Sequence, residues 1–437
     1  MTNKGLKETI KVNAVTGAGS PRCLRAGALD VEAGTLLKGI NMLGMGAPAH
    51  DTLDKHRRLW QALARVLGRG QPVAQVQNLR IPGPEEAIDI RIYRPSQGRE
   101  PLPAFIWFHG GAFLIGGLTT ADSICRHVAQ ASGAIVVSVR YRLAPEHDLY
   151  ASRTDCLAAV QWLADNGQKL GIDTTRLAVG GDSAGGNLAA AVSQRCAELG
   201  GPALRLQVLV YPATNLRDEY PSVQQNGQGY LLTLEVIEGI KNLLDERHPD
   251  VDDPWLSPAL NPRLDQVPPA LVLTAGYDPV RDDGIAYVEL LREAGVPVEL
   301  LHYPGQFHGF VNFNGVMRTA RDALDRIGGA LRHAFASAEP APHTAPNRTI
   351  EVTSHTKLPQ TRLPAPPARA LLISSLMWAE RLESLRADAM RRMVPGSRLL
   401  SALATSPVIN PATAWRALLG NHYATIEARQ TYQRSQR

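Results

Sequence analysis

A single serine stands among glycines and alanines in the stretch AVGGDSAGGN, Ala178–Asn187. The apolar run RLAVGGD comes directly before this serine, and the apolar, helix-forming stretch NLAAAVSQRCAEL follows it. A strand that turns at once into a helix has room only for very small neighbours at the turn. The stretch therefore predicts a sharp strand-to-helix turn that exposes Ser183, and it argues against a flexible linker.

Short apolar runs alternate with helix-period segments on both sides of this turn. Such alternation is typical of an α/β protein with a mostly parallel sheet between layers of helices. The expected strands are 103–109, 134–141, 176–182, 205–212, 270–276 and 297–304, and residues 80–95 predict two antiparallel strands joined by a Pro-Gly turn. Helices are expected at 152–167, 187–199 and 281–295.

The segments outside this core suggest further parts of the chain. An apolar stripe at 51–68 predicts a helix, and the long insertion at about 215–250 contains another. Both are placed to form a small helical cap over the carboxyl edge of the sheet. We therefore expect an N-terminal segment that contributes to the cap (1–70), a main domain (71–338), a Pro-rich extended linker (339–368) and a basic helical extension (369–437).

Two later loops supply the residues that a serine nucleophile needs. A serine hydroxyl requires a base to accept its proton and a carboxylate to orient that base. Asp278 directly follows one expected strand and His308 lies in a glycine-flanked loop after the next, in the chain order Ser, Asp, His. Asp282 and Asp283 fall where a helix begins and are expected to cap it, and His302 within a strand is expected to be structural.

A glycine loop follows the expected strand at 103–109. In FHGGAF, the motif residue His109 precedes Gly110 and Gly111, whose backbone N–H groups can point at a substrate oxygen. The N–H of Ala184, just after the serine, is the third expected donor. The sequence thus predicts an oxyanion hole made by Gly110, Gly111 and Ala184.

Together HGGAF, YRLAPEH, GDSAGGN, DPWLSP, GYDPVRDDG and FHGF resemble the bacterial hormone-sensitive-lipase family of α/β-hydrolases, over about Val73–Arg332. The resemblance implies an α/β-hydrolase fold with a mostly parallel eight-stranded sheet and a helical cap. It also implies cofactor-free hydrolysis of carboxylic esters, with Ser183 as nucleophile, His308 as base and Asp278 orienting it. The chain departs from the family pattern at two places. Ala112 makes the motif HGGA where the family usually has HGGG, and DLYAS follows LAPEH in place of the residues that the family usually has there.

The residue totals exclude several classes of function. Of the 437 residues 20% are charged, and the formal net charge of +5 arises from residues 340–437, where 13 Lys and Arg face 5 Asp and Glu. Nothing in the main body therefore indicates nucleic-acid binding. Residues 101–121 carry no charged side chain, but the glycines of HGGAFLIGG favour a buried strand and loop over a membrane span.

The N-terminus lacks a signal-peptide core, and Cys23, Cys125, Cys156 and Cys196 lack the close spacing of zinc sites. We expect a cytoplasmic protein with reduced thiols and no metal or cofactor, although a disulfide remains the alternative.

The sequence leaves more than one function and more than one partner open. The motifs predict a serine carboxylesterase for short- to medium-chain esters, with a small-molecule ester as its partner. The alternatives are a ligand-binding module on a hydrolase scaffold, and an amide, carbamate or lactone hydrolase with the same residues. The amphipathic stretch 370–393 predicts helices that pack on the body or on another subunit, as in a homodimer, with a basic membrane-surface anchor as the sharper hypothesis.

Overall fold

The computed structural model describes residues 24–42, 46–98, 100–336 and 347–353. The chain divides into two compact units, one of residues 1–33 and 45–360 and the other of residues 34–44 and 361–437. Most of helix α1 (Val31–Met42) belongs to the second unit, whereas every other described helix and strand belongs to the first. The expected basic extension and most of the expected linker lie outside the described residues.

A single sheet of nine strands forms the centre of the first unit, in the order β1-β2-β4-β3-β5-β6-β7-β8-β9. Strands β1 and β2 pair antiparallel, as do β2 and β4, and all other neighbours are parallel. The strands are β1 (Gln75–Ile81), β2 (Ile88–Arg94), β3 (Leu102–Phe108), β4 (Ile135–Arg140), β5 (Ile172–Asp182), β6 (Leu204–Val210), β7 (Ala270–Tyr277), β8 (Val298–Phe307) and β9 (Arg348–Glu351).

The expected α/β-hydrolase architecture is confirmed, with one correction to the strand count. The sheet has nine strands where eight were expected, because β9 comes from the segment expected to be an extended linker. The central strands are mostly buried, since helices cover both of their faces. All seven residues of β6 are buried, for example.

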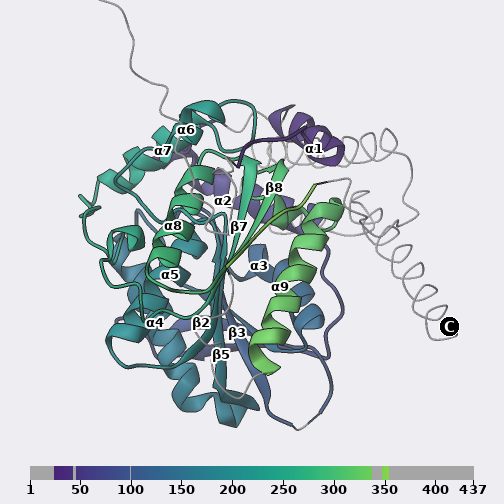
Figure 1. Ribbon diagram of the computed structural model, residues 1–437, viewed down its shortest axis with the longest axis vertical. Coiled ribbons are helices and arrows are strands. Elements are labelled where there is room, and N and C mark those ends of the chain that lie inside the picture. Colours follow the sequence, from purple (N-terminus) through teal and green to yellow (C-terminus); the bar gives the residue numbers. More distant parts are fainter. Residues whose placement is uncertain (1–23, 43–45, 99, 337–346, 354–437) are drawn as a thin grey trace, which may run out of the picture. The chain divides into compact units, whose positions relative to one another are not determined.

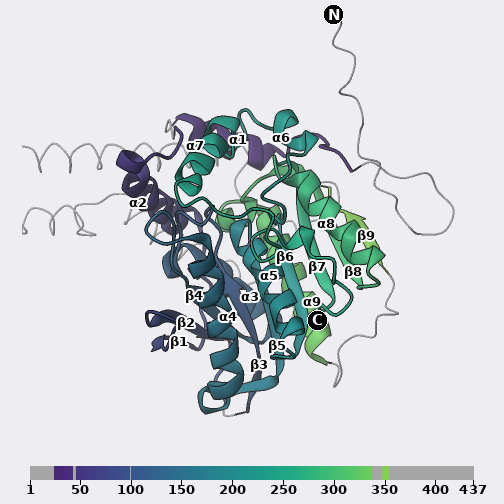
Figure 2. The same cartoon turned by 90° about the vertical axis from the view of Figure 1, so that its left-hand side faces the viewer.

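Helices lie on both faces of the sheet (Figure 1). Helices α3 (Leu118–Ser132) and α9 (Arg318–Ala336) cover one face, and α4 (Leu149–Asn166), α5 (Ala184–Glu198) and α8 (Arg281–Glu293) cover the other (Figure 2). The departure at DLYAS has a local explanation, because Asp148 caps α4 by accepting a hydrogen bond from the Ala151 N–H at 2.8 Å. Short 3-10 turns occupy Gly167–Leu170, Pro258–Leu260 and Phe310–Phe313.

Three further helices lie at the end of the sheet where β7 and β8 finish (Figure 1). They are α2 (His50–Leu67), before β1, and α6 (Pro221–Gln225) and α7 (Leu234–Asp245), in the insertion between β6 and β7. The chain entering α2 contacts α7, because the Ala47 N–H donates to Glu235 at 3.4 Å and a His50 ring nitrogen lies 2.6 Å from Glu246. We call α2, α6 and α7 the cap helices.

The described residues bear on the expectations about the cysteines and about a membrane-spanning segment. Cys125, Cys156 and Cys196 are buried free thiols, as expected, whereas Cys23 lies outside the described residues. Residues 101–121 form β3, a glycine loop and the start of α3. Within the described part of the chain, none of the helices combines the length and the apolar character that crossing a membrane requires.

Candidate active site

Ser183 occupies the turn between β5 and α5, with φ 56° and ψ −119°. A positive φ is unfavourable for a residue with a Cβ atom and is often found where function requires it. The two nearest glycines make the turn possible. A Cβ at Gly181 would overlap the carbonyl of Gly185, and a Cβ at Gly185 would overlap the carbonyl of Phe108. The Ser183 N–H donates to the Val210 carbonyl at 2.9 Å, which ties the turn to β6.

Asp278 and His308 are brought to this serine from the ends of β7 and β8. His308 Nε2 lies 2.8 Å from Ser183 Oγ, and His308 Nδ1 lies 2.9 Å from Asp278 Oδ2. Because an ionised carboxylate only accepts hydrogen bonds, we assign the imidazole proton to Nδ1, which leaves Nε2 as the acceptor of the serine hydroxyl. Asp278 is fully buried, and its Oδ1 accepts from the Val280 N–H at 2.8 Å. The structure therefore places the three expected side chains in one hydrogen-bonded row.

The glycine loop after β3 differs from expectation at one residue. The prediction that Gly110 offers a free donor is wrong, because its N–H donates to the Asp182 carboxylate at 2.8 Å. In the described part of the chain, the N–H groups of Gly111 and Ala112 donate to no acceptor. Ala112 takes a φ of 54° here, so alanine adopts the left-handed backbone that the family pattern assigns to glycine.

Asp182 is a supporting residue that sequence reasoning missed. Its Oδ1 accepts from Gly110, and its Oδ2 accepts from the Asn312 amide at 3.1 Å, so one buried carboxylate joins the serine turn, the glycine loop and the segment after His308. Burial raises the pKa of this carboxyl, while the two hydrogen bonds act in the opposite direction. The one sequence feature that could have pointed to Asp182 is its position directly before the serine in GDSAG.

Tyr211 is a second residue that the sequence did not single out. Its ring centroid lies 4.9 Å from that of His308 and 5.9 Å from that of Phe310. The backbone at Tyr211 has a φ of 37°, and its N–H donates to the Leu273 carbonyl at 2.6 Å. The ring therefore forms one wall beside the imidazole and limits where the His308 ring can turn.

His109 is buried away from solvent and has structural contacts. Its ring stacks on Tyr141 with the ring centroids 4.3 Å apart, and Nδ1 lies 2.9 Å from the Gly110 carbonyl. Burial lowers the pKa of His109 to about 4, so the ring is neutral near pH 7. The Tyr141 hydroxyl donates to the His109 carbonyl at 2.6 Å, which anchors the start of the glycine loop.

The insertion that holds α6 and α7 is tied to the loop that carries Asp278. The Asn226 amide donates to the Asp278 carbonyl at 3.0 Å, and the Ser222 hydroxyl donates to the Pro279 carbonyl at 2.6 Å. The expectation that Asp282 and Asp283 cap α8 is wrong, because the N-cap is Val280 and both carboxylates bond to the insertion. Asp282 accepts from the Ser222 N–H at 3.0 Å, and Asp283 from the Thr214 hydroxyl at 2.5 Å.

His302 lies in the interior, as expected, between the Thr274 hydroxyl and the Arg25 carbonyl, each 2.9 Å away. Within the described residues, no cluster of three or more His, Cys, Asp or Glu side chains is arranged to hold a metal ion.

Comparison with known proteins identifies the family to which the chain is similar. A family model for the alpha/beta hydrolase fold matches residues 105–312. Esterase LipI of Mycobacterium tuberculosis is 41% identical over 306 residues, which cover 68% of this chain and 93% of that protein. Ethyl acetate hydrolase of Pseudomonas putida is 35% identical over 285 residues, covering 64% and 89%. The solved structure of a hyperthermophilic esterase from Pyrobaculum calidifontis is 35% identical with a TM-score of 0.67, covering 71% of this chain and 100% of that one.

Proposed function

This chain belongs to the α/β hydrolases of the hormone-sensitive-lipase type, and we propose on this basis that it is a serine carboxylesterase acting on short- to medium-chain esters. The observation that carries the proposal is the row of hydrogen bonds from Ser183 Oγ through the His308 ring to Asp278, 2.8 and 2.9 Å long. The similarity to an ethyl acetate hydrolase supports the short end of the substrate range.

In the first stage, His308 Nε2 accepts the Ser183 proton as the serine oxygen attacks the ester carbonyl carbon. The imidazolium that forms is stabilised by the Asp278 carboxylate and then donates its proton to the leaving alcohol. In the second stage His308 removes a proton from water, whose oxygen attacks the carbonyl carbon of the acyl-serine. The imidazolium then returns this proton to Ser183 Oγ as the bond between that oxygen and the acyl group breaks, which releases the carboxylic acid and restores the serine. Asp278 keeps the imidazole in the tautomer that both stages need.

The negative oxygen of each tetrahedral intermediate is proposed to face the N–H groups of Gly111, Ala112 and Ala184. Ala184 is the first residue of α5, so its N–H has no partner within the helix and the positive end of the helix dipole points the same way. The proposed set of donors includes Ala112 and not Gly110, because the Gly110 N–H is already bonded to Asp182.

Replacement of the serine tests the proposal. Ser183→Ala is expected to lower kcat on p-nitrophenyl acetate by at least about 10⁴-fold, because no nucleophile remains, while the circular dichroism spectrum stays unchanged. Ser193→Ala is a matched control on the same helix, since the Ser193 hydroxyl is buried and, among the described residues, donates to the Ala189 carbonyl alone. A fluorophosphonate should label the wild type and the control at residue 183 and leave Ser183→Ala unlabelled.

The alternatives give different results in the same assays. A binding module would bind an ester without turnover and would not react with the fluorophosphonate. A hydrolase for amides, carbamates or lactones would be labelled at Ser183 but would favour those substrates over p-nitrophenyl esters from acetate to octanoate. Full activity of Ser183→Ala would remove Ser183 from the role of nucleophile.

A further inference from the structure

The glycine loop that carries the proposed oxyanion donors has a positive φ at five positions, and two of these, Ala112 and Phe113, have a Cβ atom that makes such an angle unfavourable. Gly111, Ala112 and Phe113 have φ values of 125°, 54° and 61°, and Gly116 and Gly117 follow with 109° and 148°. Residues with a Cβ atom rarely adopt such angles, so the surroundings must hold the loop in this form. The N–H directions of Gly111 and Ala112 depend on these same angles.

One set of contacts holds the loop from the protein interior. The Ala144 N–H donates to the Phe113 carbonyl at 2.9 Å, and the buried Arg153 guanidinium lies 5.0 Å from the centroid of the Phe113 ring. Within the loop, the N–H groups of Leu114 and Ile115 both donate to the Gly111 carbonyl at 3.0 Å. These contacts leave the Leu114 carbonyl for a partner on the other side.

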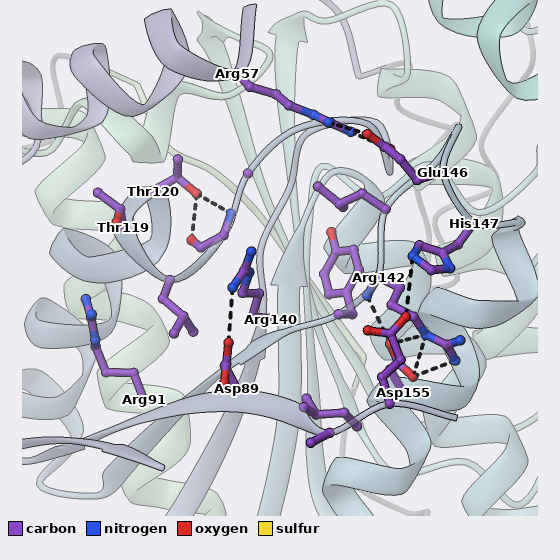
Figure 3. A pocket seen from close by; sticks show the side chains of 18 of the residues that line it. Arg57, Asp89, Arg91, Thr119, Thr120, Arg140, Arg142, Glu146, His147 and Asp155 are labelled. Carbon is purple, nitrogen blue, oxygen red and sulfur yellow. Dashed lines mark hydrogen bonds and ion pairs between the residues drawn. The ribbon is translucent and has the colours of Figure 1, made fainter. Parts of the chain in front are cut away.

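That partner is Arg57 of the cap helix α2, whose Nε donates to the Leu114 carbonyl at 2.8 Å. The other guanidinium nitrogens hold Arg57 in place, because Nη1 and Nη2 donate to the two Glu146 carboxylate oxygens at 2.6 and 2.8 Å. Nη2 also donates to the Ala144 carbonyl at 3.1 Å. Figure 3 shows the Arg57 side chain extending from its helix to Glu146. A planar guanidinium can make all these bonds together, whereas a lysine ammonium has no such fork.

The hydrogen bond from Arg57 to the Leu114 carbonyl lies beside a cavity. Arg57 and Glu146 line a cavity of about 560 Å³ together with Gly116 and Gly117 of the loop (Figure 3). Side chains therefore do not pack closely on this side of the loop, and polar contacts have to hold it.

A second cap segment contacts the same place. Arg247, just after α7, donates to the Pro145 carbonyl at 3.1 Å and to the Glu146 carbonyl at 3.0 Å. Both α2 and the end of α7 are thus fastened to residues 144–146, which in turn bond to the glycine loop.

From these contacts we infer that Arg57 is a positioning residue that couples the cap to the oxyanion loop, holding the Gly111 and Ala112 N–H groups toward the substrate oxygen. The inference rests on the proposed esterase function and adds a cap residue to it. The Arg57 side chain touches neither the substrate nor the reacting atoms in this role. It acts through the Leu114 carbonyl.

Arg57→Leu and Arg57→Lys test this role, with Arg58→Leu as a control on the next, exposed position of the same helix. We expect Arg57→Leu to lower kcat about 10- to 100-fold, less than the hundred- to thousandfold cost of deleting an oxyanion donor outright. The loss should be the same for p-nitrophenyl acetate, butyrate and octanoate, with KM changed less than about threefold. Arg57→Lys should lie between Arg57→Leu and the wild type, and Arg58→Leu should equal the wild type.

A second readout separates positioning from a merely structural role. The rate of Ser183 phosphonylation by a small alkyl fluorophosphonate should fall by the same factor as kcat, because the phosphoryl oxygen uses the same donors. Melting temperatures identify any variant that does not fold, in which case Arg57→Lys supplies the comparison. The inference is overturned if Arg57→Leu keeps kcat within twofold of Arg58→Leu, or if its loss lies in KM alone and grows with acyl length. Activity of Ser183→Ala equal to the wild type would instead reject the proposed function itself.

Discussion

Arg153 is a fully buried arginine with no carboxylate within ion-pair distance among the described residues. Its guanidinium donates to the carbonyls of Trp255 at 2.6 Å, Leu149 at 2.8 Å and Leu256 at 3.1 Å, and to the Asn187 amide oxygen at 2.7 Å. Burial lowers its pKa to about 10, which still leaves it charged near pH 7. This one side chain therefore joins α4, the start of α5 and the DPWLSP segment behind the serine turn.

Arg153→Met is expected to destabilise the fold by about 3–5 kcal/mol, because it removes four buried hydrogen bonds from a charged donor, although the Leu149 and Leu256 carbonyls keep the Ser152 hydroxyl and the Asn187 amide as donors. Urea denaturation followed by circular dichroism measures the change. Arg140→Met is the matched control, since the Arg140 side chain is 65% exposed and its pair with Asp89 is worth at most about 1 kcal/mol. Equal stability of the two variants would mean that the buried network does not support the turn.

The residues that the sequence could reveal are those whose position follows from the local order of elements. Ser183, Asp278 and His308 each stand just after a recognisable strand, and parallel strands bring their carboxyl ends to one edge of a sheet. The hydrogen bond of the Gly110 N–H could not be predicted from the local order of elements. It depends on a carboxylate 72 residues away in the chain, and the Arg153 network likewise consists mainly of backbone carbonyls that carry no sequence signature.

At the scale of elements, β9 is the clearest departure from the sequence prediction. Its residues, RTIE, are few and follow a Pro-rich stretch, so local patterns favoured a linker. What makes them a strand is a distant partner, because β9 pairs with β8 about 50 residues earlier. The Val352 N–H continues this pairing by donating to the His302 carbonyl at 2.7 Å, and β9 covers an edge of β8 that would otherwise be open to other chains.

Val352→Pro removes that N–H and is expected to loosen the end of β9. Val352→Ala is the matched control, because it loses similar packing from this buried position but keeps the donor. We expect the proline variant to be less stable than the alanine variant by about 1 kcal/mol or more, and to self-associate more at high protein concentration as the β8 edge becomes available. Urea titrations and light scattering provide the two measurements, and identical results for the two variants would show that the pairing contributes nothing.

For the molecule as a whole, the alternation of apolar runs and helical segments was enough to predict the fold class, because a parallel sheet requires helices on both faces. The links between the cap helices and the sheet were not predictable. Asp283 illustrates the reason: at the start of a helix it has the sequence position of a capping residue, but the folded chain brings Thr214 and Asn215 to its carboxylate and buries it completely. Long-range contacts of this kind also set the pH dependence of the whole fold.

Buried titratable groups act on that pH dependence in opposite directions. Burial lowers the pKa of His302 from 6.5 to about 4, so the unfolded chain binds a proton there that the folded chain does not bind over this interval. The stability due to His302 is therefore present above pH 6.5 and is lost as the pH falls toward 4, by about 3 kcal/mol. Burial raises the pKa of Asp283 from 3.8 to about 7, so here the folded chain binds the extra proton and gains stability as the pH falls from 7 to 4.

Two substitutions separate these effects when the free energy of unfolding is measured by urea titration at pH 7 and pH 4. His302→Gln keeps a polar side chain near Thr274 and the Arg25 carbonyl but cannot be protonated, so the loss of stability on acidification should be smaller than in the wild type. Asp283→Asn removes a group that gains a proton in the fold, so the loss on acidification should be larger than in the wild type. The difference between the two pH values is the quantity to compare, because either substitution can also change stability equally at both. Changes of the same sign in the two variants would contradict the assignment of a neutral His302 and a proton-binding Asp283 in the folded protein.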